Sequence, residues 1–211
     1  MCIRDRSGNS LFDAGTMALA PALGHLSRLA SLDLTFNDIG GDGAVALAPP
    51  LGRLTALTSL NLCTNELGAT GATGLAPALS SLLQLMELGF VENDIGDAGA
   101  AALAAPLGGL TALTTVCLSS NDIGDDGAAA LAAPLGGLTA LTAVDLSCND
   151  IGSTGMQELA PSLARLTALQ ELNLSRKADA LESDNEDDEA AARILRAALP
   201  ACVWQACDLS S

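Results

Sequence analysis

Residues 113–138, LTTVCLSSNDIGDDGAAALAAPLGGL, contain the pattern that decides the fold. Val116 and Leu118 lie two residues apart, which is the spacing of side chains on one face of a strand. After Gly127, apolar residues recur at intervals of three and four, which is the spacing of one face of a helix. This stretch therefore predicts a short strand, a turn and a helix.

The same unit recurs along almost the whole chain with a period of 28 residues. One asparagine marks each copy, at positions Asn9, Asn37, Asn65, Asn93, Asn121 and Asn149. A single unit is too small to bury its own leucines, so neighbouring units must cover one another. The period predicts an elongated array rather than a globule with one central core.

The unit L-x-x-L-x-L-x-x-N-x-I/L resembles the leucine-rich repeat. Its length of 28 residues and the following G-x-x-G-x-x-x-L-A-x-x-L are similar to the ribonuclease-inhibitor-like subfamily. The resemblance implies an α/β solenoid shaped like a horseshoe, with a parallel β-sheet on the concave face and helices on the convex face. It implies binding of other proteins rather than a particular reaction.

The register divides the chain into four parts. Arg4 and Arg6 would fall where the repeat requires buried leucines, so we expect the first residues to be a non-native leader of a truncated reading frame. At the other end Leu199, Cys202, Trp204 and Cys207 repeat the strand spacing, so we expect Cys202 to take the place of Leu172 and Trp204 to close the core as part of a cap. The expected parts are the leader at 1–8, leucine-rich repeats at 9–177, an acidic loop and the helix of the last repeat at 178–198, and an atypical capping strand at 199–211.

Composition excludes several classes of partner. The chain has 25 acidic residues against 9 Lys and Arg, a formal charge of −16 and only 2% aromatic residues. Such a chain repels phosphate backbones and has few rings on which bases could stack, so we expect no nucleic-acid binding. Prolines and glycines interrupt its longest uncharged stretch, so we expect no membrane partner either.

The inventory of reactive groups is poor. His25 is the only histidine, and no catalytic triad, phosphate-binding loop or dinucleotide fingerprint can be assembled. The six cysteines form neither a zinc pattern nor a convincing disulfide set, which favours a reducing, cytoplasmic location. We therefore expect a protein that is not an enzyme and has no cofactor and no metal site.

Two columns of polar residues follow each strand. The asparagine amides can bond backbone groups of the turns, which predicts a structural role for Asn37, Asn65, Asn93, Asn121 and Asn149. The next residue in each unit is acidic and predicts an acidic ridge of Asp38, Glu66, Asp94, Asp122 and Asp150. This ridge has two interpretations, either helix capping and solvated turns or an electrostatic footprint for a basic protein.

The concave face is the expected binding site. Its outward positions are mostly small, and the larger or charged candidates for protein contact are Asp33, Phe36, Asn61, Glu87, Val91, Glu92, Asp145, Glu171, Asn173 and Arg176. Few of them are the aromatic or arginine anchors that dominate tight interfaces. We expect a protein partner with a basic surface, bound by a monomer or by part of a longer chain.

Three functions remain open from the sequence. The first is a non-catalytic protein-recognition module, one version of which is the sensing region of a larger receptor, because similar repeats are appended to nucleotide-binding immune-type receptors. The alternative is a GTPase-activating regulator similar to the Ran GTPase-activating protein, which combines such repeats with an acidic segment. The third is a purely structural fragment.

Overall fold

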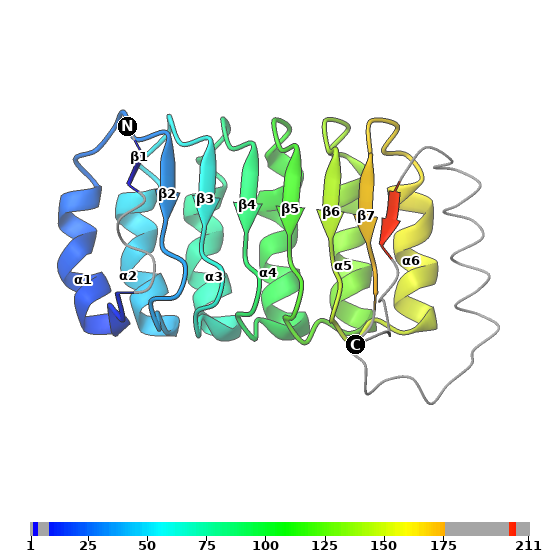
Figure 1. Ribbon diagram of the computed structural model, residues 1–211, viewed down its shortest axis with the longest axis horizontal. Coiled ribbons are helices and arrows are strands. Elements are labelled where there is room, and N and C mark those ends of the chain that lie inside the picture. The colour runs from blue at the N-terminus through cyan, green and yellow to red at the C-terminus, as the bar shows by residue number, and fades with distance from the viewer. Residues whose placement is uncertain (1, 4–8, 176–202, 206–211) are drawn as a thin grey trace.

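The computed structural model describes residues 2–3, 9–175 and 203–205, and these form a two-layer repeat array. Figure 1 shows the strands side by side in one layer and the helices in a second layer behind it. The units follow one another in chain order along the long axis. The predicted α/β repeat solenoid is thus confirmed.

In the described part of the chain the repeat strands alternate with helices, as the pattern around Val116 predicts. The strands that carry the array are β2 Ser31–Asp33, β3 Ser59–Asn61, β4 Glu87–Gly89, β5 Thr115–Cys117, β6 Ala143–Asp145 and β7 Glu171–Asn173. The helices are α1 Phe12–Leu23, α2 Gly41–Leu51, α3 Gly68–Leu79, α4 Gly96–Gly109, α5 Asp125–Gly136 and α6 Ser153–Leu163. None of the described helices is both long enough and apolar enough to cross a membrane.

All pairs of neighbouring strands are parallel and, from β2 to β7, are in the 28-residue register. Leu32 lies opposite Leu60, and Leu60 lies opposite Leu88. Equivalent side chains therefore stack in columns that run across the sheet, about 4.8 Å apart. One set of columns points into the core and the other set points to solvent.

The two ends of the sheet depart from this register. At the first end, β1 Cys2–Ile3 pairs with β2, and its offset is 29 residues, so that Ile3 rather than Arg4 lies opposite Leu32. Two residues of the expected leader thus extend the sheet. At the other end, β8 Val203–Gln205 pairs with β7 and places Trp204 opposite Leu172, where the spacing of the sequence placed Cys202.

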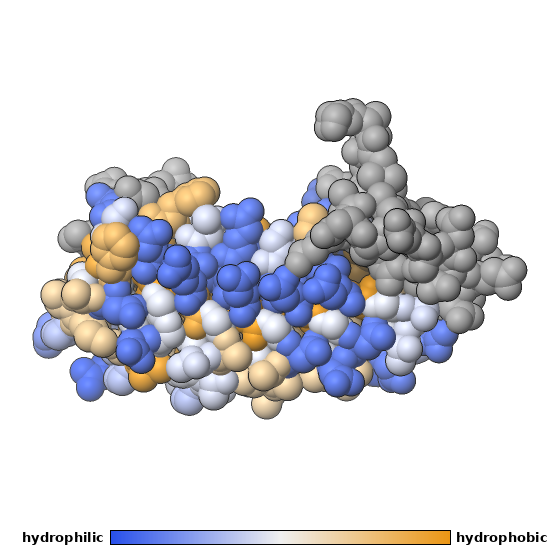
Figure 2. All heavy atoms as spheres, turned by 90° about the horizontal axis from the view of Figure 1, so that it is seen from below, coloured by the Kyte–Doolittle hydropathy of each residue, from blue (hydrophilic) through white to orange (hydrophobic). Residues whose placement is uncertain are grey.

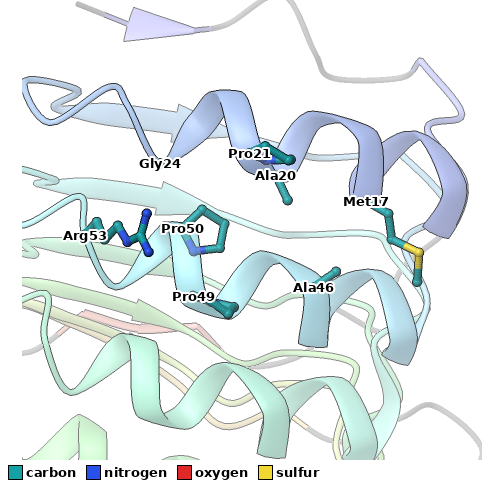
Figure 3. Close-up of a pocket in the computed structure, with 8 residues that line it drawn as sticks. All are labelled: Met17, Ala20, Pro21, Gly24, Ala46, Pro49, Pro50 and Arg53. Atoms are coloured by element: carbon teal, nitrogen blue, oxygen red, sulfur yellow. The ribbon is translucent and has the colours of Figure 1, made fainter.

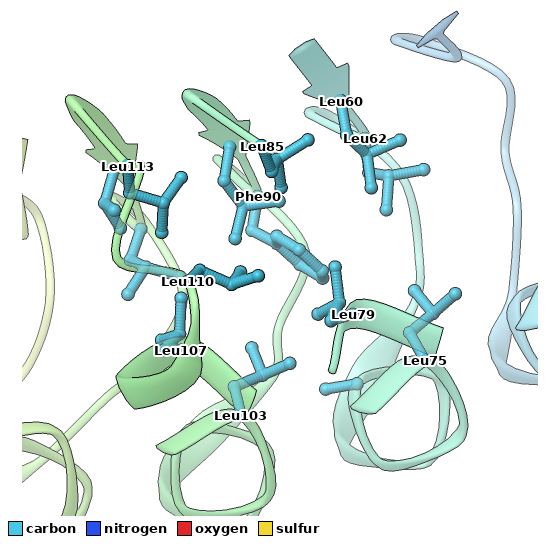
Figure 4. Packing of buried hydrophobic residues seen from close by; sticks show 14 of the residues in the cluster. Leu60, Leu62, Leu75, Leu79, Leu85, Phe90, Leu103, Leu107, Leu110 and Leu113 are labelled. Atoms are coloured by element: carbon cyan, nitrogen blue, oxygen red, sulfur yellow. The ribbon is translucent and has the colours of Figure 1, made fainter. Parts of the chain in front are cut away.

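The core lies between the two layers and runs the length of the array. Figure 4 shows Leu75, Leu79, Leu103 and Leu107 reaching from the helices towards the leucines of the strands and loops. Phe90 takes a leucine position in its unit and is fully buried. Because burying a leucine stabilises by roughly 1.5–3 kcal/mol, this continuous core provides most of the driving force for stacking.

The first unit shows how much the burial of its leucines depends on neighbouring units. Leu19 and Leu26 of the first unit are only partly buried, whereas Leu47 and Leu54, at the same positions of the second unit, are 1% and 0% exposed. The first described helix has no helix packed on its outer side among the described residues. Burial of these positions thus depends on neighbours on both sides.

Candidate protein-binding face

The recurring asparagines lie in the turn at the end of each strand and tie adjacent units together. The side-chain nitrogen of Asn65 donates to the carbonyls of Leu34, Leu62 and Cys63 at 2.9–3.1 Å. Its side-chain oxygen accepts the backbone N–H groups of Asn37 and Ile39. Each such amide satisfies buried backbone groups of two units, which fixes the position at which the chain leaves the sheet.

The column of amides is interrupted once. Backbone N–H groups of Asn9, Asn37, Asn93 and Asn121 donate to the side-chain oxygen of the next asparagine. The N–H of Asn65 instead donates to the carbonyl of Glu92 at 3.1 Å. The side-chain oxygen of Asn93 is buried and has no hydrogen-bond partner.

Three turns are held by an aspartate of the preceding unit, and we call them capped turns. Asp13 accepts the backbone N–H groups of Gly40 and Gly43, at 2.8 and 2.9 Å, with one carboxylate oxygen. Asp97 and Asp125 make the same pair of bonds to Gly124 and Gly127, and to Gly152 and Gly155. The N-terminal N–H groups of these helices are thus satisfied by a side chain from the preceding unit.

In these turns the capping side chain comes from the preceding unit and not from the residue at the N-cap position. The residues at the N-cap positions of α2, α5 and α6 are Gly40, Gly124 and Gly152, and they form no side-chain cap. The glycine three residues later is required by the close approach of the carboxylate. A Cβ on Gly127 would lie 2.5 Å from the nearer oxygen of Asp97.

The other three turns that the structure describes lack this aspartate bond, and we call them left-handed turns. Phe12, Gly68 and Gly96 stand at the position of Gly40 and have φ values of 50°, 59° and 59°. Their N–H groups donate to the carbonyls of Asn37, Asn93 and Asn121 in the next unit. Gly41 and Ala69 take the place of the aspartate before the second and third of these turns.

The solvent-facing side of strands β2 to β7, with the first residues after them, is named the sheet face. Among its predicted residues, Phe36, Glu87, Glu92 and Glu171 are exposed. The predicted residues that are half-buried there are Asp33, Asn61, Val91, Asp145 and Asn173. Arg176 lies outside the described residues.

Four of these polar side chains are held in place by the residue two positions later. Asp33 accepts both the N–H and the hydroxyl of Thr35, at 3.0 and 2.6 Å, and Asp145 accepts the same pair from Ser147, at 2.9 and 2.6 Å. Asn61 and Asn173 accept the corresponding N–H groups of Cys63 and Ser175. These side chains are therefore oriented before any partner arrives.

The sheet face also has a shallow hollow that the sequence did not reveal. It measures about 150 Å³ and lies over β5, β6 and β7. Asp145 and Glu171 contribute carboxylates to its lining, and Cys117 and Ala143 contribute small side chains. Because its shape depends on the sizes of neighbouring side chains, the motif alone gives no sign of it.

Two thiols on this face are held protonated by their surroundings. Burial raises the pKa of Cys117 to about 11, and the negative charge of Asp145 adds to the effect. Burial also raises the pKa of Cys63, with further contributions from Asp33 and Glu92, against an opposing hydrogen bond from the N–H of Val91. Since the thiolate is the reactive form, neither environment activates a cysteine nucleophile.

The five residues of the acidic ridge are all exposed and lie at the edge where the strands end. Figure 2 views the molecule from this edge and shows hydrophilic residues in a row along the array. Asp38, Asp94 and Asp122 have left-handed backbone, with φ of 52–54°. In the described part of the chain, no group of three or more His, Cys, Asp or Glu residues is arranged to hold a metal ion.

The fold and this face define a class of protein, a parallel β/α repeat solenoid with a continuous core and an acidic, solvent-facing sheet. Residues 26–48, 85–104, 109–132 and 137–160 match the family model of the Leucine Rich repeat. The chain is a leucine-rich repeat protein.

Solved structures with a similar fold include two internalins from Listeria monocytogenes. Internalin C2 is 22% identical, with a TM-score of 0.52, over 92% of this chain and 83% of that chain. The internalin inlF is 20% identical, with a TM-score of 0.40, over 87% of this chain and 62% of that chain. A comparison with curated proteins gave no match.

Proposed function

We propose that the chain is a non-catalytic protein-recognition module that binds a basic protein surface on its sheet face. The observation that carries the proposal is the charge of that face. Asp33, Glu87, Glu92, Asp145 and Glu171 lie on it, and its described residues include no Lys, Arg or His. A face with one sign of charge favours partners of the opposite sign and increases their association rate.

The distances between these carboxylates indicate how large a partner surface must be to contact several of them. Glu87 and Glu171 occupy the same strand position three units apart, a separation of about 14 Å at the usual strand spacing. Asp33 and Asp145 occupy a second position four units apart, or about 19 Å. A folded surface or a segment with several cations spans such distances, whereas one cation does not.

A lysine-rich peptide of about 20 residues, labelled with a fluorophore, serves as the probe in an anisotropy titration. The double variant Glu87→Gln/Glu171→Gln removes two exposed charges from the sheet face. We expect its dissociation constant for the peptide to be about tenfold higher than that of the wild type at low salt. We also expect the affinity of the wild type to fall as salt increases.

The matched control is Asp38→Asn/Asp94→Asn, which removes two charges from the acidic ridge and none from the sheet face. Asn tolerates the left-handed backbone at both positions. We expect less than about a threefold change for this control. An equal effect of the two double variants, or an affinity that salt does not change, would contradict recognition by the sheet face.

We also propose narrower assignments of subfamily, compartment and role. The 28-residue unit with an α-helix behind each strand supports the ribonuclease-inhibitor-like subfamily. Free thiols at Cys63, Cys117 and Cys148 support a reducing compartment such as the cytoplasm.

A sensing role within a larger receptor would use the same sheet face. A GTPase-activating role predicts faster GTP hydrolysis when the protein is added to a small GTPase, and an unchanged rate contradicts it.

A further inference from the structure

The hollow over β5, β6 and β7 forms where the middle strand carries a small residue. Ala143 takes the first position of β6, between Thr115 on β5 and Glu171 on β7. The hollow measures about 150 Å³, whereas a site for a small-molecule ligand usually has about 300–1,000 Å³. Its size therefore suits one side chain of a partner rather than a separate ligand.

Two carboxylates line this hollow with oxygens that the fold does not use. Both hydrogen bonds from Ser147 end on the Oδ1 atom of Asp145, at 2.9 and 2.6 Å. In the part of the chain that the structure describes, neither the Oδ2 atom of Asp145 nor the carboxylate of Glu171 has a hydrogen bond or an ion pair. Ala143 is the neighbour of both residues, whose Cα atoms lie about 8 Å apart at the usual strand dimensions. One cation above Ala143 is therefore within reach of both carboxylates.

The side of the hollow formed by Cys117 and Ala143 is neutral. Burial, together with the negative charge of Asp145, raises the pKa of Cys117 to about 11, so its thiol keeps the proton at neutral pH. A neutral thiol and a methyl group present a surface on which the methylene groups of a long basic side chain can pack. The hollow thus combines a place for an apolar stem with a place for a positive charge.

Two furrows on the helix side of the molecule have the opposite character. Figure 3 shows the furrow between α1 and α2, of about 300 Å³, with Met17 and Pro21 on the α1 side and Arg53 at one end. Arg53 also lines the furrow between α2 and α3. Arg53 is the charged residue in both linings, and neither lining has a carboxylate. A cationic side chain is therefore attracted to the hollow on the sheet face and not to these furrows.

We propose that the hollow over β6 holds one lysine side chain of the protein partner, with its ammonium group between Asp145 and Glu171. This inference rests on the proposed function, because it assigns an anchor within the same sheet face. A lysine has a four-carbon stem and a compact charge, whereas the guanidinium of arginine is a larger planar group. The three N–H donors of the ammonium match the three unused oxygens of Asp145 and Glu171.

The sheet face contains a counterpart of the hollow three units earlier. Ser59 and Glu87 face each other there as Ala143 and Glu171 do. Asn61 takes the place of Asp145, and its side-chain oxygen accepts the N–H of the residue two positions later, as that of Asp145 does. The counterpart therefore has one carboxylate where the hollow has two, and we expect it to contribute less to binding.

Asp145→Asn gives the hollow the polar group of its counterpart. The amide oxygen can keep both bonds from Ser147, as Asn173 accepts the N–H and the hydroxyl of Ser175, and one charge is lost. We expect the dissociation constant for the lysine-rich peptide to rise about fivefold at low salt. The matched control is Asp33→Asn, because Asp33 accepts the same pair of bonds from Thr35 but lies outside the hollow. We expect less than about a twofold change for this control.

Ala143→Leu tests the hollow without changing its charge. A leucine there fills the space above β6, and we expect the dissociation constant for the lysine-rich peptide to rise about fivefold. Ser59→Leu places the same side chain at the counterpart and should change it less than about twofold. An arginine-rich peptide of the same length should lose less than about twofold on Ala143→Leu, because its side chains are too large to enter the hollow. Circular dichroism checks that each variant is folded.

The outcomes separate this inference from the proposed function. Equal losses for Asp145→Asn and Asp33→Asn, or an unchanged dissociation constant for Ala143→Leu, would overturn the hollow as the anchor. The proposed function would still stand if the lysine-rich peptide bound the wild type and Glu87→Gln/Glu171→Gln weakened that binding. Equal losses of the lysine and arginine peptides on Ala143→Leu would overturn the assignment to lysine. If neither peptide binds the wild type, both proposals fail.

Discussion

Capped turns and left-handed turns connect the same strand to the same helix in different ways. In the capped turns of the second and fifth units, the N–H groups of Ile39 and Ile123 donate to the next asparagine side chain. The carbonyls of these two residues accept the N–H groups of Glu66 and Asp150. The left-handed turns lack these bonds and use the asparagine carbonyl instead. In every capped turn that the structure describes, one carboxylate of the preceding unit accepts the two N–H groups.

The difference shows where the repeat is strong and where it is weak. Asn65 lies in the unit after the capped turn at Gly40, and its side-chain oxygen accepts two N–H groups of that turn. Asn93, Asn37 and Asn121 all follow left-handed turns; Asn37 and Asn121 accept the N–H of the preceding asparagine, whereas the side-chain oxygen of Asn93 accepts none. A buried acceptor without a partner destabilises the folded state by roughly 1–3 kcal/mol. The junction between the third and fourth units is therefore the least well bonded part of the amide column.

The largest effect is expected from the asparagines. Asn65→Ala removes an amide with five hydrogen bonds and leaves several buried backbone groups unpaired. We expect the free energy of unfolding to fall by about 3 kcal/mol in urea denaturation. Asn93→Ala removes only the three bonds of the side-chain nitrogen and should cost about 1 kcal/mol less. Equal losses would show that the two junctions do not differ in bonding.

An intermediate effect is expected from the capping carboxylate. Asp97→Ala leaves the N–H groups of Gly124 and Gly127 without their acceptor, and should lower the free energy of unfolding by about 1–2 kcal/mol. Asp126→Ala removes a charge from an exposed position in the first turn of α5 and serves as the control. We expect the control to change stability by less than about 0.5 kcal/mol in the same assay. A control as damaging as Asp97→Ala would point to overall charge rather than to the cap.

The strands, the helices and the core could be predicted because they depend on spacing within one unit. Val116, Leu118 and Leu131 each lie where the 28-residue pattern places a buried apolar residue. The sequence also placed Glu87 and Glu171 on one face, because equivalent positions stack when units repeat without insertion. These inferences need only the period and the alternation of side chains.

The caps, the ends and the hollow could not be predicted, because they depend on distances between units. Asp13 reaches a glycine 27 residues later only because of how tightly the units stack. The pairing of Trp204 with Leu172 follows an interruption of the period, and so spacing alone does not fix it. The hollow beside Asp145 results from the sizes of side chains on three strands.

The smallest effect, and a gain rather than a loss, is expected where the cap is missing. Ala69 occupies the position of Asp97 one unit earlier, and Gly96 and Gly99 stand where the capped glycines would be. Ala69→Asp should offer a carboxylate acceptor in place of the carbonyls of Asn121 and Ile95, convert the left-handed turn at Gly96 to the capped form and raise the free energy of unfolding by about 0.5–1 kcal/mol.

Thr70→Asp, at the exposed neighbouring position, adds the same charge without reaching these N–H groups. Both N–H groups already have backbone acceptors, so amide chemical shifts at Gly96 and Gly99 distinguish the two variants, because only a new carboxylate acceptor shifts both resonances. If Ala69→Asp stabilises no more than Thr70→Asp, then local sequence selects the geometry of the turn. If it stabilises more and shifts both amide resonances, the carboxylate of the preceding unit selects the turn, and the two kinds of junction differ by one side chain.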